Sequence, residues 1–517
     1  MKANVSKNVV QGSFWGVLWR IATIVFPFII RTIIIKKLGS DYSGLNSLFS
    51  SVLNVLNLAD LGIGSAMVFA MYKPVANDDY EKISAILNLY KKAYLIIGVV
   101  VLVAGGATMP FLRFLISGDV PNDINIYTLF LIYLLNSAST YFFFAYYNSI
   151  LFAYQRQADS FKIQLFVHVA LYLIQIVLLL LFENFYLYII VLPISTIAYN
   201  LASCLYVRKK YPKIRPHGIV DDSEKKEIKK NVFSLFVFKI GSIVGNSIDS
   251  IIISSILGLT IVSNYNNYYY ILNAVSGLVL TLFNSLTAGL GNKLVYNDDE
   301  QNAKEFSLIL SINALIVVLC TSCMFGLYQD FISFWLGEDF LLPYGLMICF
   351  CVYFFVHLIQ KTTVTYRDAA GMWRDTILMP LVSASLNLCL DILLVNFFGL
   401  YGIIVATIGC MLFVELPWEA YLLLKKKIKY PLIKYFLRIV LYCFVGVASC
   451  GVCACLVSII SFVENIFIKM LLDLVFALLS GLVLFSVLTF FEENNILKIV
   501  SFMVVRFLPS KKGKKGQ

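Results

Sequence analysis

The sequence predicts an all-α polytopic membrane protein. Apolar residues make up 60% of its 517 positions and charged residues only 14%, and the mean hydropathy is +0.83. A soluble globular protein normally has an apolar share below half. The apolar residues also fall into separate runs of about 20 or more, the length that a helix needs to cross a bilayer.

About fourteen such runs follow one another along the chain, and each is expected to form a transmembrane helix. The first run is about twice as long as the apolar part of a signal peptide and lacks a small-x-small cleavage motif, so we expect it to stay in the mature chain. The approximate spans are 12–35, 43–70, 93–116, 125–152, 163–182, 186–207, 232–257, 264–292, 306–328, 342–365, 377–397, 402–424, 435–460 and 467–491.

A long internal repeat relates the two halves. A shift of about 219 positions places Arg20 on Lys239, Leu38-Gly39 on Leu257-Gly258 and Leu53-Asn54 on Leu272-Asn273. A repeat of this length is far longer than a solenoid unit. It predicts two pseudo-symmetric lobes that each begin with a cationic membrane helix, as in transporters built from structural repeats.

Lys and Arg gather in alternate loops, which predicts that both termini are cytoplasmic. The longest polar stretch, 208–230, contains helix-breaking Pro212, Pro216 and Gly218 and is interpreted as a lobe linker and orientation signal. Binding of anionic lipid headgroups is the alternative for this segment. The predicted domains are a six-span N-lobe at 1–210, a cytoplasmic linker at 211–231, a six-span C-lobe at 232–430, a helix pair at 431–495 and a basic cytoplasmic tail at 496–517.

Several functional classes fit the sequence poorly. The net charge of +11 resides in the loops as membrane orientation requires, so no nucleic-acid partner is expected. The eleven cysteines lie mostly in apolar runs, and the C-x-x-C at Cys450 and Cys453 has no second pair, so no disulfide framework, metal or cofactor is expected. The loops on the outer side are short and lack histidine, which disfavours a membrane enzyme such as a polymerase or acyltransferase. No catalytic residue is assigned.

Cationic residues inside the spans are candidates for a binding site, because a charge in the bilayer needs a cavity or a partner. Arg20 lies about 12 Å into the first span, and Arg31, eleven residues later, falls on the same helical face. With Lys239 at the equivalent depth, they predict a cationic cavity for pyrophosphate or phosphate. The alternative is that Arg20 and Lys239 pair with lipid headgroups or with acidic side chains.

Polar side chains follow one face of the second span in each half. If they face a water-filled lumen or each other, their amides are satisfied; the alternative is that they hold helices together. The candidates for this stripe are Asn54, Asn57, Asn266, Asn273 and Asn284.

Asp60 and Asp249 are candidates for proton or sodium coupling, since a buried carboxylate can titrate near neutral pH. Structural pairing with Arg or Lys is the equal alternative. Further polar residues inside the spans, which the sequence does not rank, are His168, His357, Lys361, Asp391, Glu415, Glu419 and Asp473.

The segment RTIIIKKLGSDYSGLNSLFSSVLNVLNLADLGIGSAM, after the arginine-bearing first helix, resembles the polysaccharide exporters of the multidrug/oligosaccharidyl-lipid/polysaccharide (MOP) superfamily. In particular it is similar to the Wzx-type flippases of capsule and O-antigen gene clusters. The resemblance implies a V-shaped, two-lobed transporter of the bacterial plasma membrane that moves polyprenyl-pyrophosphate-linked oligosaccharide outward by alternating access. It also implies that Arg20 and Arg31 line the cavity for the pyrophosphate.

A cation-coupled exporter of drugs or other small molecules from the same superfamily is the alternative function. The expected partners are the lipid-linked glycan, membrane lipids, H⁺ or Na⁺ as coupling ion, and polysaccharide assembly proteins.

Overall fold

Helices form nearly all of the computed structural model, which describes residues 5–57, 62–372, 375–376, 378–459, 463 and 465–490. Within these ranges there is no β-strand. Ten helices of the described part are long and apolar enough to cross a membrane, or up to eleven if the bent pair Ile126–Phe142 and Ala145–Ala153 counts as one span. The predicted all-α polytopic fold is confirmed, and the predicted number of spans is approximate.

One predicted span, 43–70, forms two shorter helices, α2 (Ser40–Leu56) and α3 (Ile63–Ala76). Gly62, just before α3, has a φ of 93°. This left-handed conformation is strained for residues with a side chain and is not part of a continuous α-helix. The apolar pattern alone does not reveal such a break.

By their internal contacts the residues divide into two units, Met1–Asn266 and Asn267–Gln517. The helices of the first unit are α1 (Val5–Lys37), α2, α3, α4 (Tyr80–Thr108), α5 (Ile126–Phe142), α6 (Asn148–Ala153), α7 (Gln157–Phe182), α8 (Phe185–Lys210), α9 (Asp222–Ile256) and the first turns of α10 (Leu259–Tyr296).

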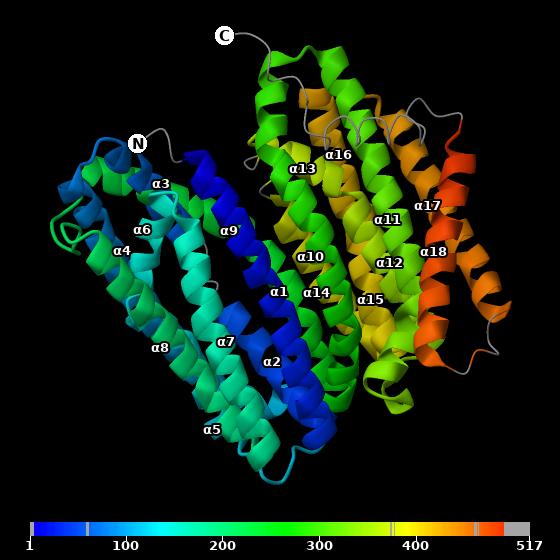
Figure 1. Ribbon diagram of the computed structural model, residues 1–517, viewed down its shortest axis with the longest axis horizontal. Helices are drawn as coiled ribbons and strands as arrows, with labels where there is room; N and C mark the ends of the chain where they lie inside the picture. Colours follow the sequence, from blue (N-terminus) through cyan, green and yellow to red (C-terminus); the bar gives the residue numbers. More distant parts are fainter. Residues whose placement is uncertain are drawn as a thin grey trace. The chain divides into compact units, whose positions relative to one another are not determined.

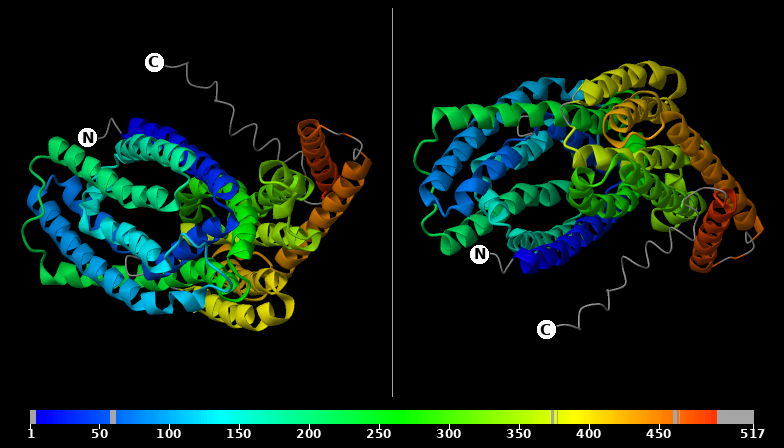
Figure 2. Two further views of the ribbon diagram at one scale, coloured as in Figure 1. Left: turned by 90° about the horizontal axis from the view of Figure 1, so that it is seen from below. Right: turned by 90° about the horizontal axis from the view of Figure 1, so that it is seen from above.

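In the first unit α1 lies along α7, and α8 packs against both α7 and α5 (Figures 1 and 2). Aromatic side chains fill the interior: the ring of Phe49 on α2 meets Phe130 and Tyr133 on α5 edge to face, at centroid distances of 5.4 and 5.7 Å. Such edge-to-face pairs contribute about 0.5–1.5 kcal/mol each beyond their buried area. These contacts fix α2 against α5.

The two copies of the repeat end their first helices in the same way. The amides of Leu38 and Gly39 both donate to the carbonyl of Ile34, and the amides of Leu257 and Gly258 both donate to that of Ile253. Both glycines have positive φ, 116° at Gly39 and 96° at Gly258. The shared Leu-Gly pair therefore produces the same helix ending at α1 and at α9, because glycine adopts this conformation without steric penalty.

The second unit contains the rest of α10 and the helices that follow it. The long helix α11 packs against α12, α17 and α18, and α14 packs against α15 (Figure 1). The bounds are α11 (Asp299–Trp335), α12 (Tyr344–Ile359), α13 (Lys361–Ala369), α14 (Leu378–Phe398), α15 (Leu400–Cys410), a π-helical turn (Met411–Glu415), α16 (Leu416–Leu423), α17 (Leu432–Ile459) and α18 (Ile466–Leu488).

Short polar side chains mark where several helices begin. The side chain of Asn125 accepts hydrogen bonds from the amides of Tyr127 and Thr128 at the start of α5. The side chain of Asn465 accepts from the amides of Phe467 and Ile468 at the start of α18. These caps satisfy amides that have no partner within the helix. An Asn just before an apolar run is thus the local reason that the helix begins there.

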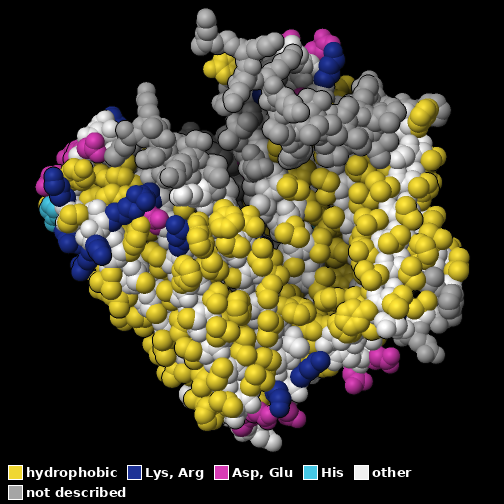
Figure 3. All heavy atoms as spheres, viewed as in Figure 1, with side chains coloured by type: hydrophobic (Ala, Val, Ile, Leu, Met, Phe, Trp, Pro, Cys, Tyr) yellow, Lys and Arg dark blue, Asp and Glu magenta, His cyan; other side chains and the backbone are white. Residues whose placement is uncertain are grey.

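Hydrophobic side chains cover much of the visible face of both units in Figure 3, as expected for surfaces in contact with lipid. On α1 the exposed apolar residues follow helical spacing along one side: Phe14, Val17, Ile21, Val25 and Ile29. Lys and Arg side chains gather toward the ends of the helices in the first unit (Figure 3).

Candidate functional site

The first helix presents its two arginines on a face of their own. Trp15, Trp19 and Phe26 of α1 pack against Phe166, His168 and Tyr172 of α7, at centroid distances of 6.2, 5.0 and 5.5 Å. At about 100° per residue, Arg20 and Arg31 lie about 20° apart around the helix and about 120–140° from the centre of this aromatic face. The arginine face therefore points away from α7.

The two arginines have different surroundings. Arg20 is exposed, and its guanidinium has no hydrogen bond or ion pair with any described residue. Arg31 is half-buried and donates a hydrogen bond of 3.1 Å from Nη2 to the carbonyl oxygen of Ser263, in the first turns of α10. Arg31 thus ties α1 to α10, whereas Arg20 is available to an anion.

Asp249 and Asn266 lie on the hairpin formed by α9 and the start of α10. The carboxyl of Asp249 is 7% exposed, and its Oδ2 accepts a hydrogen bond of 3.1 Å from Tyr265. Its Oδ1 is buried without a hydrogen-bond donor among the described residues. Asn266 donates from Nδ2 to Ser250 at 3.3 Å. A buried carboxylate with one unsatisfied oxygen is costly in the charged form.

These contacts bring three of the predicted residues to one region. Arg31 reaches Ser263, Asp249 accepts from Tyr265, and Asn266 follows directly, so all three meet at the first turns of α10. The predicted partners Lys239 and Asp60 give no structural information: the side chain of Lys239, on α9, and the whole of Asp60 lie outside the described residues.

The polar stripe of α2 divides between two environments. Oδ1 of Asn57 accepts hydrogen bonds from Ser137 at 2.5 Å and Tyr141 at 3.2 Å, both on α5. Asn54, one turn earlier, is exposed. Asn57 therefore joins two helices inside the unit, as in the alternative interpretation of the stripe, and Asn54 keeps an amide free for solvent or ligand.

The stripe of α10 continues in the second unit. Asn273 and Asn284 are both exposed, and so is Thr281 between them. Eleven residues separate the two asparagines, so they share one helical face. This face carries polar groups at the surface of a helix whose neighbouring positions Leu278 and Leu282 are exposed and apolar.

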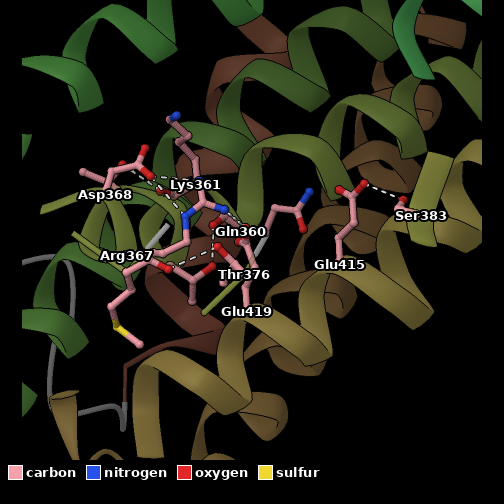
Figure 4. Close-up of polar contacts among 11 residues, drawn as sticks. Gln360, Lys361, Arg367, Asp368, Thr376, Ser383, Glu415 and Glu419 are labelled. Carbon is pink, nitrogen blue, oxygen red and sulfur yellow. Dashed lines mark hydrogen bonds and ion pairs between the residues drawn. The ribbon is translucent and has the colours of Figure 1, made fainter. Parts of the chain in front are cut away.

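A buried charge cluster in the second unit contains two residues, Arg367 and Asp368, that were not among the candidates from the sequence. Arg367 of α13 is 6% exposed and donates to Glu419 of α16, which is 3% exposed, and to Asp368 at 2.9 Å (Figure 4). Lys361 lies nearby, close enough to interact electrostatically with Asp368 and Glu419. The predicted span 342–365 ended before Arg367, so its side chain was placed in a loop.

Glu415 belongs to the same region but has its own partner. It ends the π-helical turn that precedes α16 and accepts a hydrogen bond of 2.7 Å from Ser383 of α14 (Figure 4). A π-helical turn shifts the register of the side chains after it and often occurs at functional sites. With Asp368 and Glu419 it makes three carboxylates against the two cations Arg367 and Lys361.

A second buried carboxylate lies between α14 and α15. Asp391 is completely buried, and its Oδ1 accepts from Asn387 at 3.3 Å. The same amide lies 3.2 Å from the hydroxyl of Thr407, which donates to the carbonyl of Ile403. The amide nitrogen of Asn387 therefore links the carboxylate of Asp391 to the hydroxyl of Thr407 across the helix pair.

The other unranked polar residues have structural neighbours. The ring of His168 packs at a tilt against Trp19, Tyr172 and Tyr199, and its Nδ1 contacts the carbonyl of Gln164. The ring of His357 lies nearly parallel to that of Tyr353. Asp473 is fully buried on α18, and no group of three or more His, Cys, Asp or Glu side chains in the described part is arranged to hold a metal ion.

Comparison with known proteins gives two kinds of similarity. The profile of a family described as "Polysaccharide biosynthesis protein" matches residues 9–287, which is more than half of the chain. No curated protein sequence matches the chain.

Three solved structures are similar over most of their length. The lipid II flippase MurJ in an inward closed conformation has a TM-score of 0.66 and 16% identity, over 93% of this chain and 99% of that chain. An inward-facing multidrug resistance MATE family transporter of the MOP superfamily has a TM-score of 0.59 and 14% identity, over 76% and 94%. A Vibrio cholerae MATE transporter has a TM-score of 0.57 and 12% identity, over 83% and 98%. At these identities the likeness establishes the fold.

Proposed function

We propose that the chain, which belongs to the polysaccharide biosynthesis protein family, is a flippase of the MOP superfamily for polyprenyl-pyrophosphate-linked oligosaccharide. The cargo is a repeat unit for capsule, O-antigen or a similar polysaccharide. It is carried across the bacterial plasma membrane by alternating access between two six-span lobes, with both chain termini in the cytoplasm. The reaction is transport, and it requires no covalent step.

The observation that carries this proposal is the state of Arg20. An arginine within an apolar span, exposed and with no ion pair or hydrogen bond of its side chain to the described residues, needs an anionic partner. Arg31 lies on the same face, held by Ser263. Two guanidiniums on one face suit a pyrophosphate, because arginine donates paired hydrogen bonds to phosphate oxygens. Lys239, equivalent to Arg20 in the repeat, supplies the third cation.

The exposed amides are proposed to contact the glycan. Asn54 on α2 and Asn273 and Asn284 on α10 are polar groups at exposed helix surfaces inside apolar segments. Amides both donate and accept hydrogen bonds, as sugar hydroxyls do. We assign them to the polar lining of the transport pathway.

Asp249 is assigned to ion coupling, with Asp60 as the second candidate from the sequence. Its carboxyl is buried, and Oδ1 has no donor among the described residues, so binding of H⁺ or Na⁺ would remove an unfavourable buried charge. Asp391, also buried, is a further carboxylate that an ion could neutralise. Coupling through these groups would bias the lobes between their conformations.

Competition for binding distinguishes this function from export of drugs. A polyprenyl pyrophosphate is titrated against the purified protein, with an organic cation as competitor, and the same titration is made on Arg20→Ala. A flippase should bind the pyrophosphate and should not bind the organic cation. Its affinity for the pyrophosphate should be about 10- to 100-fold lower in the variant. Displacement of the pyrophosphate by the cation, or binding of the cation alone, would instead support a cation-coupled small-molecule exporter.

A further inference from the structure

A pocket in the first unit combines an apolar interior with a lysine rim. It has a volume of about 370 Å³ and lies where α3, α4 and the first half of α9 meet. Its lining includes Met67 of α3, Ala93 and Ile96 of α4, and Ile228 and Phe236 of α9. Three lysines complete it: Lys92, Lys225 and Lys229.

The polarity of the pocket changes in one direction along α9. Lys225 and Lys229 come first, and Val232 and Phe236 follow on the same helical face, since steps of three or four residues return to one side. The lysines therefore lie at the start of the helix and the apolar side chains lie further along it. An anionic headgroup above acyl chains has this same order of charge and hydrocarbon.

Two of the three lysines are available to a ligand. Lys225 forms an ion pair with Asp222 at 2.9 Å. Lys92 and Lys229 are both exposed, and neither has an ion pair with a described residue. Lys92 and Lys229 therefore remain at the rim without an ion pair to the described part of the chain, and Lys229 is close enough to Asp222 to interact with it electrostatically.

The pocket is held in shape by contacts of the neighbouring loop. Lys82 of α4 pairs with Glu224 of α9 at 3.1 Å, and Asn88 of α4 donates to the carbonyl of Gly218 at 2.9 Å. The amide of Arg215 also donates to Ser84. These bonds fix the start of α9 beside α4, so the pocket walls are positioned before any ligand arrives.

We propose that this pocket binds an anionic phospholipid of the surrounding bilayer, with the phosphate between Lys92 and Lys229 and an acyl chain against Met67, Ala93 and Phe236. Ammonium groups near a membrane surface attract anionic lipids, and the volume is within the usual range of ligand pockets. The site is separate from the arginine face of α1 and does not depend on the proposed transport function.

The test uses the full-length protein, delipidated in detergent, and measures binding of phosphatidylglycerol and of phosphatidylcholine with the same acyl chains by native mass spectrometry. The native protein is expected to prefer phosphatidylglycerol. Lys92→Ala with Lys229→Ala should weaken phosphatidylglycerol binding about 30-fold, or about 2 kcal/mol at 1.4 kcal/mol per tenfold. Phosphatidylcholine binding should not change.

A matched control removes two other lysines from the same two helices: Lys91 on α4 and Lys226 on α9. Lys91→Ala with Lys226→Ala changes two lysines that do not line the pocket and should bind as the native protein does. Ala93→Phe places a ring into the apolar part without altering charge and should weaken binding of phosphatidylglycerol.

Three results would overturn the proposal. They are equal binding by the native protein and the pocket variant, an equal loss in the control variant, and displacement of phosphatidylglycerol from the pocket by a polyprenyl pyrophosphate. The last result would assign the pocket to the transported lipid.

Discussion

The hydroxyl of Thr260 donates a hydrogen bond of 2.6 Å to the carboxylate of Asp41, and the two residues are equivalent positions of the repeat, 219 residues apart. Each lies in the first turn after a Leu-Gly helix ending. The two repeat junctions therefore contact each other directly.

Gly44 permits this contact, and its replacement should disrupt it. A Cβ at Gly44 would lie 2.3 Å from the carbonyl oxygen of Leu259, so the backbones would have to move apart. Gly44→Ala is expected to destabilise the protein by about 1–3 kcal/mol, seen as a lower unfolding temperature in detergent. Gly106→Ala is the control, because nothing lies within 4 Å of its Cβ and alanine is favoured in a helix interior. An unchanged unfolding temperature in Gly44→Ala would contradict the close approach.

Substitutions of the two arginines of α1 should differ in their effect on stability but not in their effect on transport. Arg20→Ala removes an exposed side chain with no partner in the described structure, so the free energy of unfolding should change by less than about 0.5 kcal/mol. Arg31→Ala removes the hydrogen bond to Ser263 and should lower the free energy of unfolding by about 1.5–3 kcal/mol. Translocation should fall about tenfold or more in both variants.

Unfolding in detergent and translocation in proteoliposomes measure the two effects. Lys37→Ala, near the end of α1, is the control for loss of a cation, since its pair with Glu183 is solvent-exposed and should contribute less than about 1 kcal/mol. Full transport by Arg20→Ala would remove the arginine face from the proposed site.

The pair Arg367 and Glu419 should be sensitive to loss of either partner. Both side chains are buried, and removal of Glu419 would take away the buried acidic partner of Arg367 and leave its pair with the more exposed Asp368. Glu419→Ala is expected to destabilise the protein by about 3–5 kcal/mol. The double variant Arg367→Met with Glu419→Met should recover most of this loss, because it removes both buried charges of the pair. If the double variant were less stable than Glu419→Ala, the simple pairing would be refuted.

His217 should make the loop between α8 and α9 dependent on pH. Its ring nitrogens donate hydrogen bonds to the carbonyl of Arg215 and the carboxylate of Glu81, and these two contacts raise the pKa of His217 above its usual value of 6.5. The contact is fully present below about pH 6.5 and is lost as the pH rises through the raised pKa. Hydrogen exchange of residues 211–221, corrected for intrinsic rates, should therefore be slower at about pH 6 than at about pH 8. His217→Gln should abolish the difference; a persistent difference would assign it to another group.

Much of the fold followed from periodicity and composition. The apolar runs located the membrane helices, and the Leu38-Gly39 and Leu257-Gly258 pairs of the repeat proved to have the same backbone conformation. The family was also correctly identified from the segment after the first helix. These features depend on local sequence, so they can be seen without coordinates.

The contacts between helices could not be predicted in the same way. The stripe on α2 did not indicate that Asn57 would meet Ser137 and Tyr141, because that depends on how α5 packs. Arg367 appeared to follow a span, and it is buried where α13 packs against neighbouring helices, α16 among them. The roles of Arg20, Lys239 and the two aspartates remain predictions about ligands rather than about packing.

The most direct measurement is translocation of a labelled polyprenyl-pyrophosphate oligosaccharide in proteoliposomes, by the native protein and by Arg20→Ala with Lys239→Ala. The account predicts movement to the opposite leaflet by the native protein and its loss in the double variant, at equal reconstitution. Equal movement by both would contradict the cationic site. No movement by the native protein, with several glycans and with either ion gradient, would contradict the proposed cargo.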